Sequence, residues 1–86
     1  GDFGDMPITA YAITKTALNA LTIKMAKDFR SSRILVNSVC PDVTASRGPG
    51  WGRPVADSAL GVVWAATLPD DGPTGLFFRD GKQLPW

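Results

Sequence analysis

A single tyrosine and a nearby lysine are the residues of this chain whose types and spacing could support acid–base chemistry. Tyr11 and Lys15 stand four residues apart, in the order Tyr-Ala-Ile-Thr-Lys. On a helix this spacing places both side chains on one face. A cation close to a phenol stabilises the phenolate, which makes the phenol a usable proton donor or acceptor. The alternative interpretation is structural, with a tyrosine packed at the start of a helix and a lysine in solvent.

The pair lies in a segment that predicts a long helix from Pro7 to Phe29. Proline suits the first turn of a helix, and Asp5 just upstream is a candidate cap. Apolar residues recur at three- and four-residue spacing and predict one apolar stripe, made of Leu18, Leu21, Met25 and Phe29. Tyr11 and Lys15 lie near the same face of this helix.

The middle of the chain predicts a strand, a loop and a second helix. Residues 33–40 have apolar side chains on both faces and end at Pro41, a pattern typical of a strand in a parallel sheet that is buried on both sides. Residues 41–53 predict a loop because they are rich in proline and glycine. A second helix is predicted over residues 54–68, and because its apolar residues nearly encircle it, we expect it to be buried on more than one side.

The end of the chain predicts a short second strand over residues 74–78, followed by a turn at Asp80-Gly81 and a tail. A strand, a crossover helix and a second strand form a βαβ unit with parallel strands. A sheet of two strands has two open edges, which is difficult to reconcile with strands that are apolar on both faces. The sequence is therefore expected to be α/β and to form a piece of a larger sheet.

Composition argues against several classes of function. The chain has 86 residues and a net charge of +1, and its nine basic and eight acidic residues form no basic stripe, which argues against nucleic acid or an anionic membrane as the main partner. With no histidine, and with Cys40 as the one cysteine, neither a metal site nor a disulfide framework is expected. The N-terminus lacks the pattern of a secretory signal, and the weakly polar run over residues 59–68 is too short to span a bilayer. We therefore expect a reducing, cytoplasmic location.

Two longer stretches resemble one known family. The segment YAITKTALNALTIKMAKDFRSSRILVNSVCP closely resembles short-chain dehydrogenases/reductases, which have Tyr-x-x-x-Lys on a long helix and then a strand that ends in Val-Asn-x-Val-x-Pro. The later stretch VVWAATLPDDGPTGLFFRDGKQLPW resembles the ending of bacterial carbonyl-reductase-like members. The resemblance covers nearly the whole chain from about residue 8 onward. It implies that the chain is the C-terminal part of a Rossmann-type doubly wound parallel sheet, in the order helix, strand, helix, strand.

The resemblance also implies roles for individual residues. Tyr11 would be the catalytic acid that protonates a carbonyl oxygen as hydride arrives from a nicotinamide, and Lys15 would hydrogen-bond the nicotinamide ribose and assist Tyr11. The family loop that holds the nicotinamide reads Pro-Gly-x-x-x-Thr and corresponds here to residues 41–46. Its candidate cofactor contacts, together with Lys15, are Pro41, Asp42, Val43 and Ser46. Ser46 keeps a hydroxyl where the family has threonine, whereas Asp42 replaces the glycine and puts an anionic side chain with less backbone freedom close to the cofactor.

The implied activity is NAD(P)-dependent reduction of a small-molecule carbonyl to an alcohol, or its reverse. NADP is preferred over NAD because carbonyl-reductase-like relatives favour it. Residues 1–86 are expected to be a single partial domain without the N-terminal dinucleotide-binding half. The family's Gly-rich pyrophosphate loop, its catalytic serine and its proton-relay asparagine would all precede Tyr11, where the chain has none of them. We therefore expect the isolated chain to be inactive, with no tightly bound cofactor.

Other residues with chemical potential are interpreted as structural. Asn37 is expected to be a packing and hydrogen-bonding residue of the first strand, and Cys40 a small buried hydrophobe. Arg47 and Arg53 are expected to be solvated. The three tryptophans are expected to pack rather than to stack on a ligand: Trp51, Trp64 and Trp86.

A second interpretation comes from another class: a non-catalytic remnant, or assembly module, that folds by self-association or with another subunit. A third is an unrelated small α/β protein. An upstream Gly-rich βαβ unit in the same reading frame would favour the enzyme, and a gene that starts near Gly1 would favour the remnant. For the chain as it stands we expect a homo-oligomer, because one small core without disulfides gives little stability.

Overall fold

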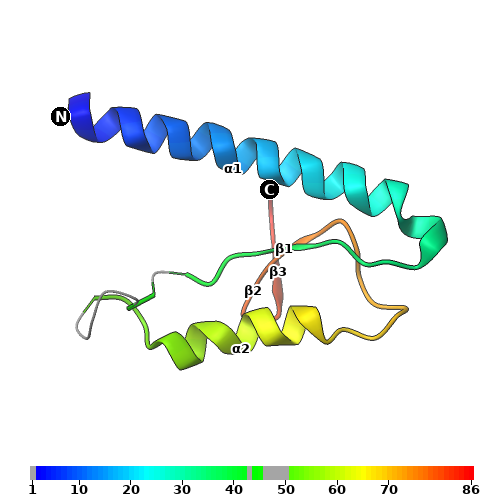
Figure 1. Cartoon of the computed structure of the whole chain (residues 1–86). Helices are drawn as coiled ribbons and strands as arrows, with labels where there is room; N and C mark the ends of the chain where they lie inside the picture. The colour runs from blue at the N-terminus through cyan, green and yellow to red at the C-terminus, as the bar shows by residue number, and fades with distance from the viewer. Residues whose placement is uncertain (1, 43, 46–50) are drawn as a thin grey trace.

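The computed structural model describes residues 2–42, 44–45 and 51–86, with side chains from residue 9 onward. The elements are, in chain order, the helix α1 (Asp2–Asp28), the 3-10 turn η1 (Arg30–Ser32), β1 (Ser38–Val39), α2 (Val55–Ala66), β2 (Phe77–Arg79) and β3 (Lys82–Leu84). Figure 1 shows the strands between the two helices, with α1 on one side and α2 on the other. The protein is thus a small α/β unit, as the order of predicted elements indicates.

The helix α1 begins earlier than predicted, at Asp2 rather than at Pro7. Pro7 therefore lies inside the helix rather than in its first turn, and a proline there has no N–H to donate to the helical ladder. The predicted cap at Asp5 is wrong, because this residue is itself helical. Beyond α1 the chain turns through η1 to Arg33, whose backbone is left-handed (φ 59°) and donates its N–H to the carbonyl of Arg30 at 3.0 Å.

The sheet has three strands in the order β1-β2-β3. β1 and β2 are parallel, with Ser38 opposite Phe77, and α2 lies between them in the chain as predicted. β3 is antiparallel to β2, with Arg79 opposite Lys82. The sheet is therefore mixed, and the prediction that only a tail follows the second strand is wrong.

The turn at Asp80-Gly81 joins β2 and β3 as a two-residue hairpin. Both residues have positive φ angles, 52° and 77°, which is the combination that type I′ hairpin turns require and that Asp-Gly supplies. Lys82, Gln83 and Leu84 then pair with β2, although these side chains do not alternate clearly between polar and apolar. That lack of alternation explains why the sequence pattern does not predict β3. The turn before it lies at the predicted position.

The strand β1 is shorter than predicted, because the chain just before it is held mainly by side-chain hydrogen bonds. The side-chain amide of Asn37 accepts from the Leu76 N–H at 3.0 Å and donates to the Pro73 carbonyl at 2.9 Å. The Val36 N–H donates to Thr74 Oγ1 at 2.9 Å. These bonds join the approach to β1 to the approach to β2 without a regular ladder.

The core of the protein is small. Among the described residues the buried apolar side chains are Ala26 and Phe78. Thr22 of α1 and Ser38 of β1, both buried, share a hydrogen bond of 2.7 Å that connects this helix to the sheet. On the other side, Trp64 of α2 packs edge-on against Phe78, with ring centroids 5.0 Å apart. Each helix is therefore held to the sheet through a narrow contact.

Both helices expose large apolar side chains. The buried residues of α2 are Ser58 and Gly61, while its exposed large apolar side chains are Val55, Leu60, Val62, Val63 and Trp64. α1 likewise exposes Ile13, Leu18, Leu21 and Ile23. The prediction that the second helix is buried on more than one side is wrong for the single chain, because the described residues supply no second layer. Neither helix in this described part combines the length and the apolar character needed to cross a membrane.

Candidate active site

Tyr11 and Lys15 line the same groove from one face of α1, as their four-residue spacing predicts. The Lys15 Nζ lies 5.4 Å from the centroid of the Tyr11 ring, a distance at which a cation is attracted to the face of an aromatic ring. The Tyr11 residue is 63% exposed. The phenol is therefore accessible to a ligand and already has a cation beside it.

The groove has a volume of about 510 Å³ and lies between α1 and residues 36–40. Apolar side chains form most of its walls: Leu18, Leu21 and Met25 from α1, Val36 and Val39 from the strand region, and Phe77 from β2. An apolar cleft that contains a few polar groups is the usual form of a small-molecule site. The phenol of Tyr11 and the ammonium of Lys15 are two such groups.

Asn19 is a third polar side chain of the groove, and it was not among the predicted site residues. It is half-buried and lines the same cleft. Position 19 follows Lys15 by four residues, as Lys15 follows Tyr11, so the three side chains continue one face of α1. This repeated spacing is the sequence signal that could have identified it. Its amide can both donate and accept a hydrogen bond.

The predicted cofactor-binding segment begins where β1 ends. Pro41 and Asp42 are exposed and follow directly after Cys40, which lines the groove together with Lys15, but neither of the two is itself among the lining residues. Asp42 has a φ angle of 65°, in the left-handed region that favours glycine and that aspartate tolerates better than most residues. The glycine that the resemblance implies for this position would suit the same backbone conformation. Outside the described residues lie the two other predicted contacts, Val43 and Ser46.

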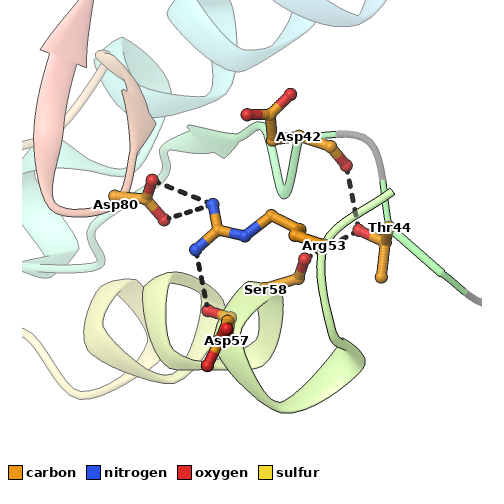
Figure 2. Close-up of polar contacts among 6 residues, drawn as sticks. All are labelled: Asp42, Thr44, Arg53, Asp57, Ser58 and Asp80. Carbon is orange, nitrogen blue, oxygen red and sulfur yellow. Dashed lines mark hydrogen bonds and ion pairs between the residues drawn. The ribbon is translucent and has the colours of Figure 1, made fainter. Parts of the chain in front are cut away.

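A polar cluster joins the segment after β1 to α2 and to the β2–β3 hairpin (Figure 2). Arg53 Nη1 donates to both carboxylate oxygens of Asp80 at 2.9 Å, and Nη2 donates to the Asp57 carbonyl at 3.4 Å. The hydrogen bond to Asp80 is the main cause that raises the pKa of Arg53 above its ordinary value, and the nearby charges of Asp80, Asp42 and Asp57 add to it. The prediction that Arg53 is merely solvated is therefore wrong. Its partner lies 27 residues further along the chain, so no local pattern marks the pair.

The remaining candidates differ in how well they match their predicted roles. Asn37 bonds through both ends of its amide to the backbone before β2, which is a structural role. Cys40 is a free thiol that is half-buried rather than buried, because it borders the groove.

Trp64 packs on the sheet as described, and Trp86 stacks on a sheet phenylalanine with ring centroids 5.6 Å apart. Trp51 is 65% exposed, so the prediction of packing is wrong for this residue within the chain. Arg47 lies outside the described residues.

The fold and the groove define an α/β unit with a mostly apolar, ligand-accessible cleft beside a parallel strand, in which a few polar groups are placed. No protein-family model matches the chain. It is 42% identical over 80 residues to (−)-isopiperitenone reductase of Mentha piperita, which covers 87% of this chain and 24% of the relative. It is 34% identical over 88 aligned residues to carbonyl reductase (NADPH) 1 of Mus musculus, covering 93% of this chain and 32% of the relative.

The name of a third relative includes the name of its family. Short-chain dehydrogenase/reductase 1 of Saponaria officinalis is 32% identical over 83 residues, which cover 91% of this chain and 26% of the relative. The chain belongs to the short-chain dehydrogenase/reductase family. It spans between 24% and 32% of the length of these curated relatives.

Proposed function

We propose that the chain is the C-terminal part of an NADP-dependent short-chain reductase that converts a carbonyl to an alcohol. The observation that carries this proposal is the shared groove of Tyr11, Lys15 and the end of β1, because open α/β sheets bind ligands at the carboxyl ends of their strands. The names of two relatives, a reductase and an NADPH carbonyl reductase, support the same chemistry. A cytoplasmic location suits the free thiol of Cys40.

The described residues fit the nicotinamide end of a dinucleotide. The Lys15 ammonium has three donors for ribose hydroxyls, and the apolar walls of the groove suit a nicotinamide ring or the body of a substrate. When bound, NADPH would supply hydride to the carbonyl carbon. The carboxylate of Asp42 does not suit the pyrophosphate, because like charges repel each other. The pyrophosphate would therefore be held by residues outside these 86.

The acid–base step falls to Tyr11. As negative charge develops on the carbonyl oxygen, the Tyr11 hydroxyl donates its proton to that oxygen and becomes a phenolate. The ammonium of Lys15 stabilises this phenolate, since an opposite charge close by favours the ionised form. Asn19 is in a position on the same helix face to hydrogen-bond the substrate or an ordered water.

Two substitutions in the natural enzyme test these roles. Tyr11→Phe removes the proton donor with little change in volume, so we expect kcat to fall by about 100-fold or more while the affinity for NADPH stays unchanged. Lys15→Ala should lower kcat and also weaken NADPH binding, because this side chain is assigned to the ribose as well. Steady-state kinetics and calorimetric titration with NADPH provide both readouts.

Two control substitutions on α1 check that the effects are specific. Lys24→Ala removes an exposed lysine that pairs with Asp28 at 2.7 Å, and Thr16→Ala removes an exposed hydroxyl that bonds to the Ala12 carbonyl. Neither residue lines the groove of Tyr11 and Lys15, so both variants should keep full turnover. A Tyr11→Phe enzyme that keeps more than a few per cent of the turnover would show that another residue supplies the proton.

The surface of the chain supports a second candidate function, that of an assembly module without catalysis. Its accessible surface is 6506 Å², whereas a compact monomer of this mass exposes about 4,900 Å². Its radius of gyration is 15.0 Å, against about 12 Å for a compact domain of this length. We propose that the isolated chain covers part of this surface by association with further copies of itself. NADPH-dependent turnover of the natural protein distinguishes the enzyme from the module.

We also propose that the three strands form the end of a doubly wound sheet. β1 is the first strand in the order β1-β2-β3, so its second edge is not covered by a strand within the described residues. An uncovered edge is a site at which a further strand can add. In a longer chain, a parallel strand from the upstream part would pair with β1 and close one side of the groove.

A further inference from the structure

The polar cluster of Figure 2 holds the two ends of the segment between β1 and α2 together. The Ala45 N–H donates to the Arg53 carbonyl at 2.8 Å, and Thr44 forms an isolated bridge with Arg53. Thr44 and Ala45 follow β1, whereas Arg53 lies just before α2. The described ends of this segment are therefore paired with each other, and we call this pairing of Thr44 and Ala45 with Arg53 the closed base.

A hydroxyl pair fixes the first end of this segment to α2. Thr44 Oγ1 donates to the Asp42 carbonyl at 2.9 Å and shares a 2.8 Å hydrogen bond with Ser58 Oγ. Because the single proton of the Thr44 hydroxyl goes to Asp42, Ser58 is the donor in the second bond. Ser58 is only 5% exposed, so this bond is shielded from water. The left-handed conformation of Asp42 is thus connected to a buried residue of α2.

The other end is fixed by an ion pair to the hairpin turn. The Arg53 guanidinium binds both carboxylate oxygens of Asp80 at 2.9 Å, with the two side chains 27% and 48% exposed. Asp80 cannot move away easily, because α2 lies directly against it. A Cβ added to Gly61 would stand 3.3 Å from the backbone nitrogen of Asp80. The turn of the hairpin is therefore a fixed point to which Arg53 is attached.

We propose that Arg53 and Asp80 are positioning residues that hold the closed base, and with it Asp42, in the conformation in which Asp42 meets the ligand. Arg53 stands within electrostatic reach of three carboxylates, those of Asp42, Asp57 and Asp80. Without its charge the repulsion among these carboxylates would be less well balanced, and the closed base would open more often. The proposed function enters only in naming the ligand as the nicotinamide end of NADPH; the positioning itself concerns contacts within the chain.

Amide hydrogen exchange of the natural protein, resolved by residue and measured without added cofactor, tests this proposal. Asp80→Asn keeps the size of the side chain and removes its charge. We expect the Ala45 amide, which is bonded to Arg53, to exchange roughly two- to fivefold faster, as the loss of a partly exposed ion pair implies. The Cys40 amide, bonded to the Phe78 carbonyl at 2.8 Å, should keep its rate because it reports on the sheet. A change in both amides would mean general destabilisation and would overturn the proposal.

Charge exchange and a matched control complete the experiment. Arg53→Asp combined with Asp80→Arg restores the pair in reverse and should return the Ala45 amide towards its original rate, whereas either single change should not. Asp28→Asn breaks the comparable ion pair of Lys24 on α1 and should leave Ala45 unaffected. An Ala45 amide that exchanges like an unstructured one in the unaltered chain, or that ignores Asp80→Asn, contradicts the proposal. Because no NADPH is present, failure of the proposed reductase activity would leave these outcomes unchanged.

Discussion

Asp42 combines a left-handed backbone, with a φ angle of 65°, with a charged side chain. The resemblance to the family implies a glycine in this position, and glycine adopts that region without a steric penalty. Arg33 and Asp80 are the other non-glycine residues with positive φ among those described. The positive charge of Arg53 lies within electrostatic reach of the Asp42 carboxylate. An aspartate can therefore occupy this position, but its left-handed backbone conformation has an energetic cost that a glycine would avoid.

Two substitutions at position 42 measure this cost. Asp42→Gly and Asp42→Ala both remove the carboxylate, so the comparison between them isolates the backbone. We expect the alanine variant to be less stable to urea than the glycine variant by about 1 kcal/mol, because a Cβ is disfavoured in the left-handed region. The same pair at the exposed Asp70, whose φ is not positive, is the control, and there alanine should be at least as stable as glycine. Equal stabilities at position 42 would show that its backbone conformation is not required.

Local spacing made part of the site predictable from the sequence. Tyr11 and Lys15 share a helix face because four residues make about one turn, and Asn19 could have been found by the same rule. The pair of Arg53 and Asp80 could not, since 27 residues separate its members and their contact exists only after α2 and the hairpin pack. Sequence patterns thus indicate which groups share an element, while packing decides which elements meet.

Among the elements, α1 carries the proposed catalytic residues and must keep its place over β1. The connection of these two elements is polar at its centre, where the hydroxyls of Thr22 and Ser38 meet at 2.7 Å and are both buried. Thr22 Oγ1 also lies 2.8 Å from the Leu18 carbonyl, within the helix. A buried hydroxyl that loses its partner keeps the full cost of desolvation. The contact therefore specifies how α1 sits on the sheet.

Thr22→Val should lower the free energy of unfolding by about 1–3 kcal/mol, because it leaves the Ser38 hydroxyl buried without this partner. Thr16→Val is the matched control in the same helix, since that hydroxyl is exposed and bonds only to the Ala12 carbonyl; its effect should stay within about 0.5 kcal/mol. Urea denaturation followed by circular dichroism measures both. Adding Ser38→Ala to Thr22→Val should recover part of the loss. If the two valine variants are equally stable, the buried hydroxyl pair does not hold α1 in place.

Helices were easier to predict than strands for a physical reason. Each helix has a repeated apolar pattern over many residues, and its interior was located correctly even where the start of α1 was not. The strands are two or three residues long, too short for an alternating pattern to be distinguished from chance. Their pairing depends on side chains far along the chain, as with Asn37, whose amide bonds to Pro73 and Leu76. The hairpin turn was the strand feature with a clear local signal.

At the scale of the whole molecule, the chain exposes more surface than its mass requires. The excess over a compact monomer is about 1,600 Å², which is comparable to the area buried in a standard protein interface. Much of it is apolar, with Leu60 of α2 70% exposed and Ile13 of α1 66% exposed. We propose that this apolar surface is covered by an interface. In the proposed enzyme the interface would be with the rest of the chain and with further subunits.

The isolated chain should therefore not be a stable monomer. Light scattering on a size-exclusion column at micromolar concentration should give a mass well above 9.2 kDa. Leu60→Glu, which places a charge on the exposed face of α2, should weaken the association, because an unpaired charge is costly to bury. Lys82→Glu, a charge change on the exposed strand β3, is the comparison and should have a smaller effect. A compact monomer that unfolds cooperatively would mean that the two helices and the sheet are sufficient on their own.

The measurement that tests the central claim most directly is the intact mass of the natural gene product. If the chain is the C-terminal part of a short-chain reductase, the mass should be about three to four times the 9.2 kDa of these residues, since the relatives are matched over 24% to 32% of their length. The additional residues should precede Gly1 in the same frame and include a Gly-rich loop after a first strand. A natural product of 9.2 kDa would contradict the claim and favour the non-catalytic assembly module.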